Sequence, residues 1–191
     1  LTGGDSSERN IALASAKNVS KALKSKYNLA IFDFPKDLKK FINSYHDFQA
    51  AIPVFHGPGG EDGVIQGFLK TLGIKFIFSD IEAHALGMDK AMTKFLAAKI
   101  GLLTPPYRVL NKKEKINYKK RLVVKPLSGG SSIGIEIVGD QKSLDQAIEK
   151  AFKYCDKVLI EDYISGEEFT VAIVDKNGAS FALPVIEIKS K

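Results

Sequence analysis

Apolar residues recur at helical spacing along much of the chain, and short apolar runs lie between those stretches. The helical spacing predicts helices over residues 7–24, 37–45, 64–72, 83–100 and 143–154. In the first half, strands are expected at 29–34, 50–57 and 74–79. Pro53 should interrupt pairing within the second strand, because it has no amide proton to donate. Strands that alternate with helices favour a parallel α/β sheet.

The second half of the chain has a different pattern. Short strands are expected at 121–126, 133–138, 157–164, 167–175 and 180–188, around the single helix 143–154. Residues 176–179 predict a tight turn between the last two strands. This order favours an α+β domain on a mostly antiparallel sheet. We expect the domain boundary between about residues 80 and 120, where Pro105 and Pro106 end a helix.

Residue types at two helix starts predict capping boxes. Asp5 can cap the first helix, with Glu8 three residues later. Ser143 and Gln146 have the same spacing at the start of the last helix. Each pair would satisfy amide protons that have no partner within the helix.

The composition is that of a globular protein, with 45% hydrophobic and 26% charged residues in 191. No apolar run approaches the ~20 residues of a membrane span, and the start of the chain does not have the pattern of a signal peptide. The first residue is not Met, so we expect the chain to be trimmed at its front. Cys155 is the one cysteine and is expected to be packed. A cytoplasmic protein with no membrane partner is the simplest interpretation.

The net charge of +6 raises the question of a nucleic-acid partner. The densest basic run, residues 111–121, is typical of a solvated connector. The sequence has no helix-turn-helix, zinc finger or aromatic-rich binding motif. An anionic small ligand explains the charge equally well, and no nucleic-acid partner is expected.

Two glycine-containing stretches in the first half precede helices. GGDSSE, residues 3–8, can form an anion site at a helix start, but for this stretch alone a well-capped helix is the favoured interpretation. HGPGGEDG, residues 56–63, ends a strand with His56 and reaches Glu61 at the next helix start. Ligands bind beyond the carboxyl ends of strands in α/β sheets, so the second stretch favours a functional site.

The stretch VVKPLSGGSSIG, residues 123–134, is neither a P-loop nor a dinucleotide fingerprint, because Lys125 precedes the glycines. It can be a phosphate-binding flap, with Lys125 as a point charge and with backbone amides and the hydroxyls of Ser131 and Ser132 as donors. It can equally be a polar hairpin loop.

The stretch VLIEDYISGEEF, residues 158–169, is rich in carboxylates. Strand alternation places Glu161 and Tyr163 on one face, and Glu168 follows a glycine turn. The stretch can be a solvent-facing edge or the wall of a nucleotide pocket.

Together these stretches resemble the D-alanine–D-alanine ligases, which are ATP-grasp enzymes of peptidoglycan synthesis. Four segments match in order and spacing: GGDSSERNIALASA, HGPGGEDGVIQGFL, MDKAMTK and VVKPLSGGSSIG; VLIEDYISGEEFTVAIV continues the match. The resemblance implies an N-terminal parallel-sheet (pre-ATP-grasp) domain over residues 1–85. A connecting helix and linker would follow over 86–120, and the first part of an ATP-grasp domain over 121–191.

The resemblance also implies roles for single residues. Glu8 would bind the ammonium group of the first D-alanine and share a hydrogen-bond network with Ser131. His56, supported by Glu61, would lie by the carboxylate and acyl phosphate of that substrate. The implied nucleotide-binding residues are Lys90, Lys125, Ser131 and Ser132 for the phosphates, Glu161 and Tyr163 for the adenine region, and Glu168 for the ribose.

The implied reaction joins two D-alanines through an acyl phosphate, with ATP and Mg²⁺ or Mn²⁺, in a homodimer. The family continues beyond Lys191, and the metal ligands and an oxyanion-binding Arg are expected there. The 191 residues alone are therefore expected to be inactive and to hold no metal. The alternatives are a ligase that joins D-alanine to D-lactate or D-serine, and an ATP-grasp remnant that binds nucleotide without turnover.

Overall fold

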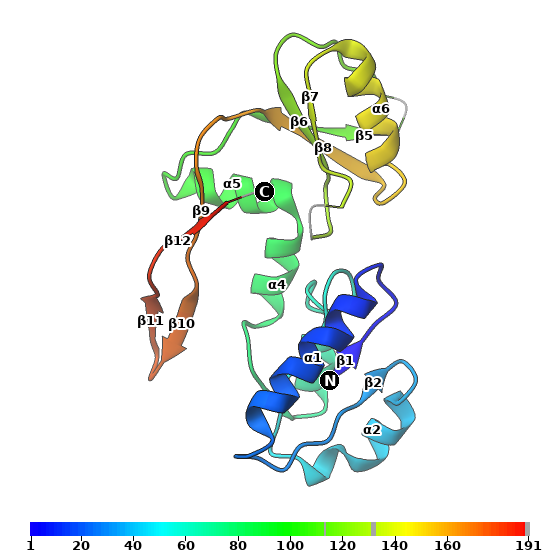
Figure 1. Ribbon diagram of the computed structural model, residues 1–191, viewed down its shortest axis with the longest axis vertical. Helices are drawn as coiled ribbons and strands as arrows, with labels where there is room; N and C mark the ends of the chain where they lie inside the picture. Colours follow the sequence, from blue (N-terminus) through cyan, green and yellow to red (C-terminus); the bar gives the residue numbers. More distant parts are fainter. Residues whose placement is uncertain (113, 131–132, 190–191) are drawn as a thin grey trace.

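The computed structural model describes residues 1–112, 114–130 and 133–189 (Figure 1). The predicted site residues Ser131 and Ser132 lie outside the described residues. The helices are α1 (Arg9–Leu23), α2 (Leu38–Ser44), the 3-10 turn η1 (Tyr45–Asp47), α3 (Val64–Thr71), α4 (Ile81–Met88), α5 (Lys90–Lys99) and α6 (Gln141–Ala151). Within the described ranges, no helix combines the length and apolar character needed to cross a membrane.

Strands in the first half pair in parallel, as predicted. They are β1 (Thr2–Gly3), β2 (Asp33–Phe34), β3 (Ala50–Ala51) and β4 (Lys75–Phe76). β1 pairs with β2 and β3 pairs with β4, and a bridge between Thr2 and Val54 joins the two pairs. Pairing is interrupted at Pro53, as its missing amide proton requires.

A cluster of aromatic and aliphatic side chains stabilises this half. Its buried members are Phe32, Phe34, Phe41, Ala51, Phe55, Ile65, Leu69 and Ile74. Phe41 packs edge-on against Phe32, with ring centroids 5.2 Å apart. The cluster includes Phe55, which directly precedes the glycine-containing loop at residues 56–63.

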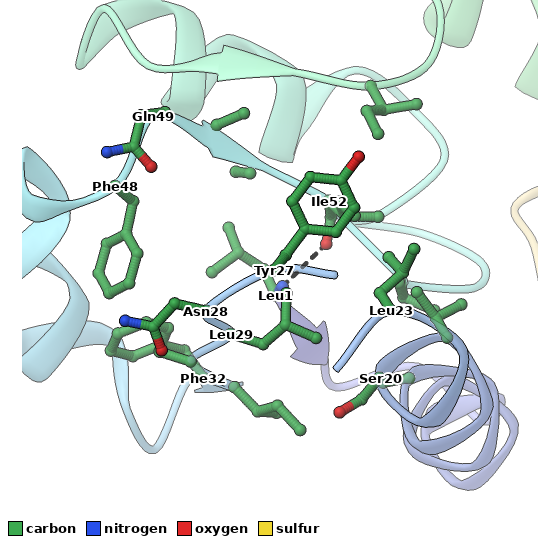
Figure 2. A pocket seen from close by; sticks show the side chains of 18 of the residues that line it. Leu1, Ser20, Leu23, Tyr27, Asn28, Leu29, Phe32, Phe48, Gln49 and Ile52 are labelled. Carbon is green, nitrogen blue, oxygen red and sulfur yellow. Dashed lines mark hydrogen bonds between the residues drawn. The ribbon is translucent and has the colours of Figure 1, made fainter. Parts of the chain in front are cut away.

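The strand predicted at 29–34 is much shorter in the structure. Residues 29–32 instead line a cavity of about 610 Å³, together with residues of α1 such as Ser20 and Leu23 (Figure 2). Only Asp33 and Phe34 have a paired strand beside them, and an extended segment becomes a sheet strand only where its backbone finds partners.

The predicted capping box of Asp5 and Glu8 is wrong. α1 begins at Arg9, Glu8 is its N-cap residue, and no side chain caps the helix. The turn before it begins at Gly3, where φ is +100° and a Cβ would lie 2.4 Å from the carbonyl oxygen of Phe34. This close approach requires glycine and delays the helix start.

The second half contains an antiparallel sheet, as predicted, and its four strands have the order β5-β8-β6-β7. The segments expected as strands at 167–175 and 180–188 lie outside this sheet. Its strands are β5 (Tyr107–Asn111), β6 (Leu122–Pro126), β7 (Glu136–Val138) and β8 (Lys157–Asp162). β5 lies in the segment expected to be a linker, and it forms an edge of this sheet.

α6 covers one face of the sheet (Figure 1). Val158 and Ile160 of β8 join its core, while the alternating residue Glu161 lies on the opposite face. The capping box predicted from Ser143 and Gln146 is wrong, because α6 begins earlier. Asp140 accepts a bond of 2.7 Å from the Ser143 amide and forms the box with Ser143.

The last strands form two exposed ribbons. β9 (Glu168–Thr170) pairs with β12 (Ile186–Ile188), and β10 (Ile173–Lys176) pairs with β11 (Ala179–Ala182). The predicted turn between β10 and β11 is confirmed, with positive φ angles of 54° at Asn177 and 78° at Gly178.

The packing of the core beneath α6 leads to a prediction for stability. Leu144 is fully buried, so Leu144→Ala should lower the free energy of unfolding by about 2–5 kcal/mol through lost burial and a residual cavity. Leu103→Ala is the matched control, because Leu103 is fully exposed. Urea denaturation of the two variants measures the difference, and equal midpoints would contradict the packing.

Candidate functional site

The single helix predicted at 83–100 is wrong, and the difference creates part of the site. α4 ends at Met88 and α5 begins at Lys90, because Asp89 adopts an extended conformation between them. The carboxylate of Asp89 accepts hydrogen bonds from the amides of Ala91 and Met92 at 2.9 and 3.0 Å. A side chain that caps a new helix start outweighs the apolar periodicity that runs through it.

The loop after β6 binds to this junction of α4 and α5. The backbone amide of Lys90 donates to the carbonyl oxygen of Leu127 at 3.2 Å, and its Nζ donates to the carbonyl oxygen of Gly129 at 2.8 Å. The Gly129 amide donates to the Met88 sulfur at 3.2 Å. The loop is therefore bound to the junction of α4 and α5 at both Leu127 and Gly129.

Lys125, the lysine that precedes the glycines, lies on the sheet face opposite α6. It forms an ion pair with Glu161 of β8. The other carboxylate oxygen of Glu161 lies 2.7 Å from Nζ of Lys94, which comes from α5. The strand register brings these groups together, because Lys125 pairs with Leu159, two residues before Glu161.

Two carboxylates of the N-terminal half lie beside the same loop. A Cβ built on Gly130 would lie 3.8 Å from Oε2 of Glu8 and 3.9 Å from Oε2 of Glu61. Glu8 is only 3% exposed, and its Oε2 would lie 2.7 Å from a Cβ built on Gly57. The structure therefore brings together three stretches that are far apart in the sequence.

His56 lies beside one of these carboxylates, that of Glu61. Its Nε2 lies 3.3 Å from Oγ of Ser15, and its Nδ1 lies 3.9 Å from Oε1 of Glu61. The other carboxylate oxygen of Glu61 accepts a hydrogen bond of 2.7 Å from the Gly57 amide. The carboxylate is thereby held beside the imidazole ring of His56.

Tyr163 and Glu168 are placed differently from the other predicted site residues. The guanidinium of Arg121 lies over the ring of Tyr163, 4.2 Å from its centroid. Glu168 is exposed on β9. Among the interactions of the described residues, no hydrogen bond or ion pair joins Glu168 to the Lys125 and Glu161 pair.

The charged groups near the loop perturb one another. Burial lowers the pKa of Lys90, and the positive charge of Lys125 lowers it further. Burial raises the pKa of Glu161, but hydrogen bonds from Lys125 and Lys94 outweigh that effect and hold the pKa below its usual range. Glu161 is thus ionised at neutral pH, between two ammonium groups.

Cys155 is partly buried beneath the same loop, with its sulfur 3.3 Å from Oγ of Ser128. Burial raises the pKa of its thiol, but hydrogen bonds from Ser128 and from backbone amides outweigh this effect and lower the pKa overall. Across the part of the chain that the structure describes, no group of three or more His, Cys, Asp or Glu side chains could hold a metal ion.

Sequence reasoning did not identify three residues that shape the site. Lys94 holds Glu161, Ser15 contacts His56, and the amide of buried Gln66 donates to the Gly60 carbonyl at 3.0 Å. A signal was present for Gln66, since a polar residue on the buried face of an apolar helix requires a specific partner. Ser15 and Lys94 lie on helices with no such signal.

The chain is similar to known proteins over its whole length. The family model for the C-terminal part of the D-alanine–D-alanine ligases matches residues 96–191, which is half of the chain. The D-alanine–D-alanine ligases of Methylacidiphilum infernorum and Geobacter sulfurreducens are 44% and 38% identical, over 100% and 98% of this chain. In both comparisons the match covers 61% of the relative, so the chain spans about three-fifths of the length of these curated relatives.

A solved structure gives the same result for the fold. The D-alanine–D-alanine ligase of Bacillus anthracis complexed with ATP matches with a TM-score of 0.83 and 32% identity, over 100% of this chain and 65% of that one. The mixed helix and strand architecture is therefore that of an ATP-grasp protein. On the family match and the order of its motifs, the chain belongs to the D-alanine–D-alanine ligase family.

Proposed function

We propose that the protein to which this chain belongs is an ATP-dependent D-alanine–D-alanine ligase. The observation that carries the proposal is that two carboxylates and an ammonium group lie beside the same loop. Glu8 and Glu61 lie beside Gly130, and the ammonium of Lys90 binds the carbonyl of Gly129, one residue earlier. A ligase needs a site for a substrate ammonium next to a site for phosphates, and the loop brings these groups within reach of each other.

In the first step, the carboxylate of one D-alanine attacks the γ-phosphorus of ATP and releases ADP, leaving an acyl phosphate. Glu8 would bind the ammonium of this D-alanine, and His56 would lie by its carboxylate. Lys90 and Lys125 would neutralise charge on the phosphates. Free carboxylates do not react with amines, so phosphoryl transfer supplies the leaving group, and positioning with charge neutralisation supplies the rate.

In the second step, the amine of another D-alanine attacks the acyl carbonyl, and inorganic phosphate leaves as the peptide bond forms. The loop of residues 127–134 would cover the phosphates. We propose that Glu161 and Tyr163 line the adenine region and that Glu168 binds the ribose. Ser131 and Ser132, outside the described residues, would donate to phosphate oxygens, and Ser131 would also bind Glu8.

The wider organisation follows the same proposal. Residues 1–85 would form the domain for the first substrate, 86–120 a connection that also supplies edge strand β5, and 121–191 the first part of the nucleotide domain. ATP and Mg²⁺ or Mn²⁺ would serve the reaction in a cytoplasmic homodimer that supplies peptidoglycan precursors. The described residues contain no carboxylate cluster for the metal, so its ligands would come from elsewhere in the full protein.

Phosphate release by the full-length protein tests this function. ATP with D-alanine should give ADP, phosphate and the dipeptide. Phosphate release only with D-alanine plus D-lactate or D-serine would identify the alternative ligases. Nucleotide binding without turnover would identify a binding module.

The buried carboxylate of Glu8 leads to a prediction for the kinetics. Glu8→Gln in the full-length protein should raise KM for the first D-alanine by about 10–100-fold, the cost of one charge-assisted hydrogen bond. KM for ATP should change less than about twofold, because Glu8 lies on the substrate side of the loop. Initial rates at varied D-alanine and ATP measure both constants, and equal effects on the two substrates would contradict the assignment.

Two glycines of one loop provide a sharper comparison. Gly57 and Gly59 have φ of +75° and +83°, so each alanine variant should carry similar backbone strain of about 1–2 kcal/mol. The new Cβ at position 57 would lie 2.7 Å from Oε2 of Glu8, whereas position 59 has nothing within 4 Å. Gly57→Ala should therefore raise KM for the first D-alanine well above the value for Gly59→Ala. Steady-state kinetics at matched folded fractions would detect the difference, and identical constants would remove Glu8 from the substrate site.

A further inference from the structure

Glu161 lies between two lysines that reach it from different elements. Nζ of Lys94, from α5, is 2.7 Å from Oε2, and Lys125, from β6, pairs with Oε1. Only 9% of the Glu161 side chain is exposed. Each carboxylate oxygen is therefore occupied by one ammonium group, on the sheet face opposite α6.

Lys94 is held by more than this one ion pair. Its Nζ also donates to Oγ1 of Thr104 at 2.5 Å and lies 5.2 Å from the centre of the Tyr107 ring. Its side chain is 11% exposed, compared with 26% for Lys125. A buried ammonium needs such compensation, and these contacts place Lys94 behind Glu161 while Lys125 remains nearer to solvent.

The charges of the three side chains do not cancel. Two ammonium groups and one carboxylate leave one positive charge in excess. Without Lys94, the pair of Glu161 and Lys125 would be neutral and would attract a polyanion only weakly. The carboxylate of Asp89 accepts hydrogen bonds from the amides of Ala91 and Met92 at the start of α5, and its negative charge raises the pKa of Lys90.

We propose that Lys94 is a positioning residue that neutralises Glu161 and so leaves the charge of Lys125 available to the nucleotide phosphates. This inference rests on the proposed function, because it requires ATP at Lys125. Lys94 itself would not touch the nucleotide. Its effect would pass through Glu161, and the buried ion pair would act as an electrostatic support for the phosphate site.

The neighbourhood of Lys90 agrees with an excess of positive charge. Burial is the main cause that lowers the pKa of Lys90, and repulsion from the charge of Lys125 lowers it further, against the opposite effects of Cys155, Asp89 and Glu161. A bound polyanion would relieve this repulsion. The cost of holding the lysines together without a ligand would then be recovered on ATP binding.

The test is ATP binding to the full-length protein with Lys94→Met, which keeps the length of the side chain and removes its charge. Calorimetry should show ATP affinity about tenfold weaker, the effect of losing roughly one charge-assisted interaction. The affinity should also depend less on salt. KM for D-alanine should stay within about twofold. The matched control is Lys70→Met, whose exposed pair with Asp80, at 2.6 Å, lies in another part of the chain.

A double variant separates electrostatic support from simple packing. Because Glu161 is itself proposed to line the adenine region, Glu161→Gln alone is the reference, and adding Lys94→Met to it should change ATP affinity by less than about twofold, since no carboxylate remains for Lys94 to neutralise. The double variant also buries no unpaired carboxylate, so it keeps the test open if Lys94→Met folds poorly. A further loss of about tenfold on adding Lys94→Met to Glu161→Gln would overturn the inference.

The wild-type protein distinguishes the two levels of the proposal. If it does not bind ATP, the proposed function fails and the inference fails with it. If it binds ATP, and Lys94→Met binds with the same affinity, only the role of Lys94 is overturned.

Discussion

The candidate site depends on the binding of one loop to a break between two helices. Asp89 ends α4 and starts α5, and the backbone of residues 127–129 binds to this break through Lys90 and Met88. The loop leaves a rigid strand, β6, whose Val124 is fully buried in the sheet core. Because both ends of the contact are fixed, the following Gly130 is placed beside Glu8 and Glu61. Without this contact, the acidic and basic groups would belong to separate units.

Charge is concentrated at this contact in a way that folding alone does not favour. Glu8 and Glu161 are almost fully buried, Lys94 is largely buried and Lys90 is partly buried. Removing charges from water is costly, and buried ion pairs seldom recover the whole cost. Such an arrangement is typical of a site whose groups are held ready for a charged ligand. The apolar clusters in each half supply the stability that this arrangement requires.

Much of the fold could be predicted from local pattern. The parallel pairing in the first half, the antiparallel sheet in the second and the tight turn at Asn177 follow from periodicity and turn chemistry. Two of the errors share a cause. The break at Asp89 and the box between Asp140 and Ser143 depend on which polar side chain accepts the hydrogen bonds of the amides at a helix start. Apolar spacing carries no information on that competition.

The sequence by itself determined the family of the chain, the classes of its elements and the residue types available for chemistry. Motifs carry this information because a fold by itself seldom requires glycine, lysine and carboxylate residues at a fixed spacing. Only the tertiary structure decided which of these groups meet. Lys94 and Glu161 are 67 residues apart in the sequence, and their contact depends on strand register and on the position of α5. Long-range contacts of this kind are set by the packing of whole elements, which no local pattern records.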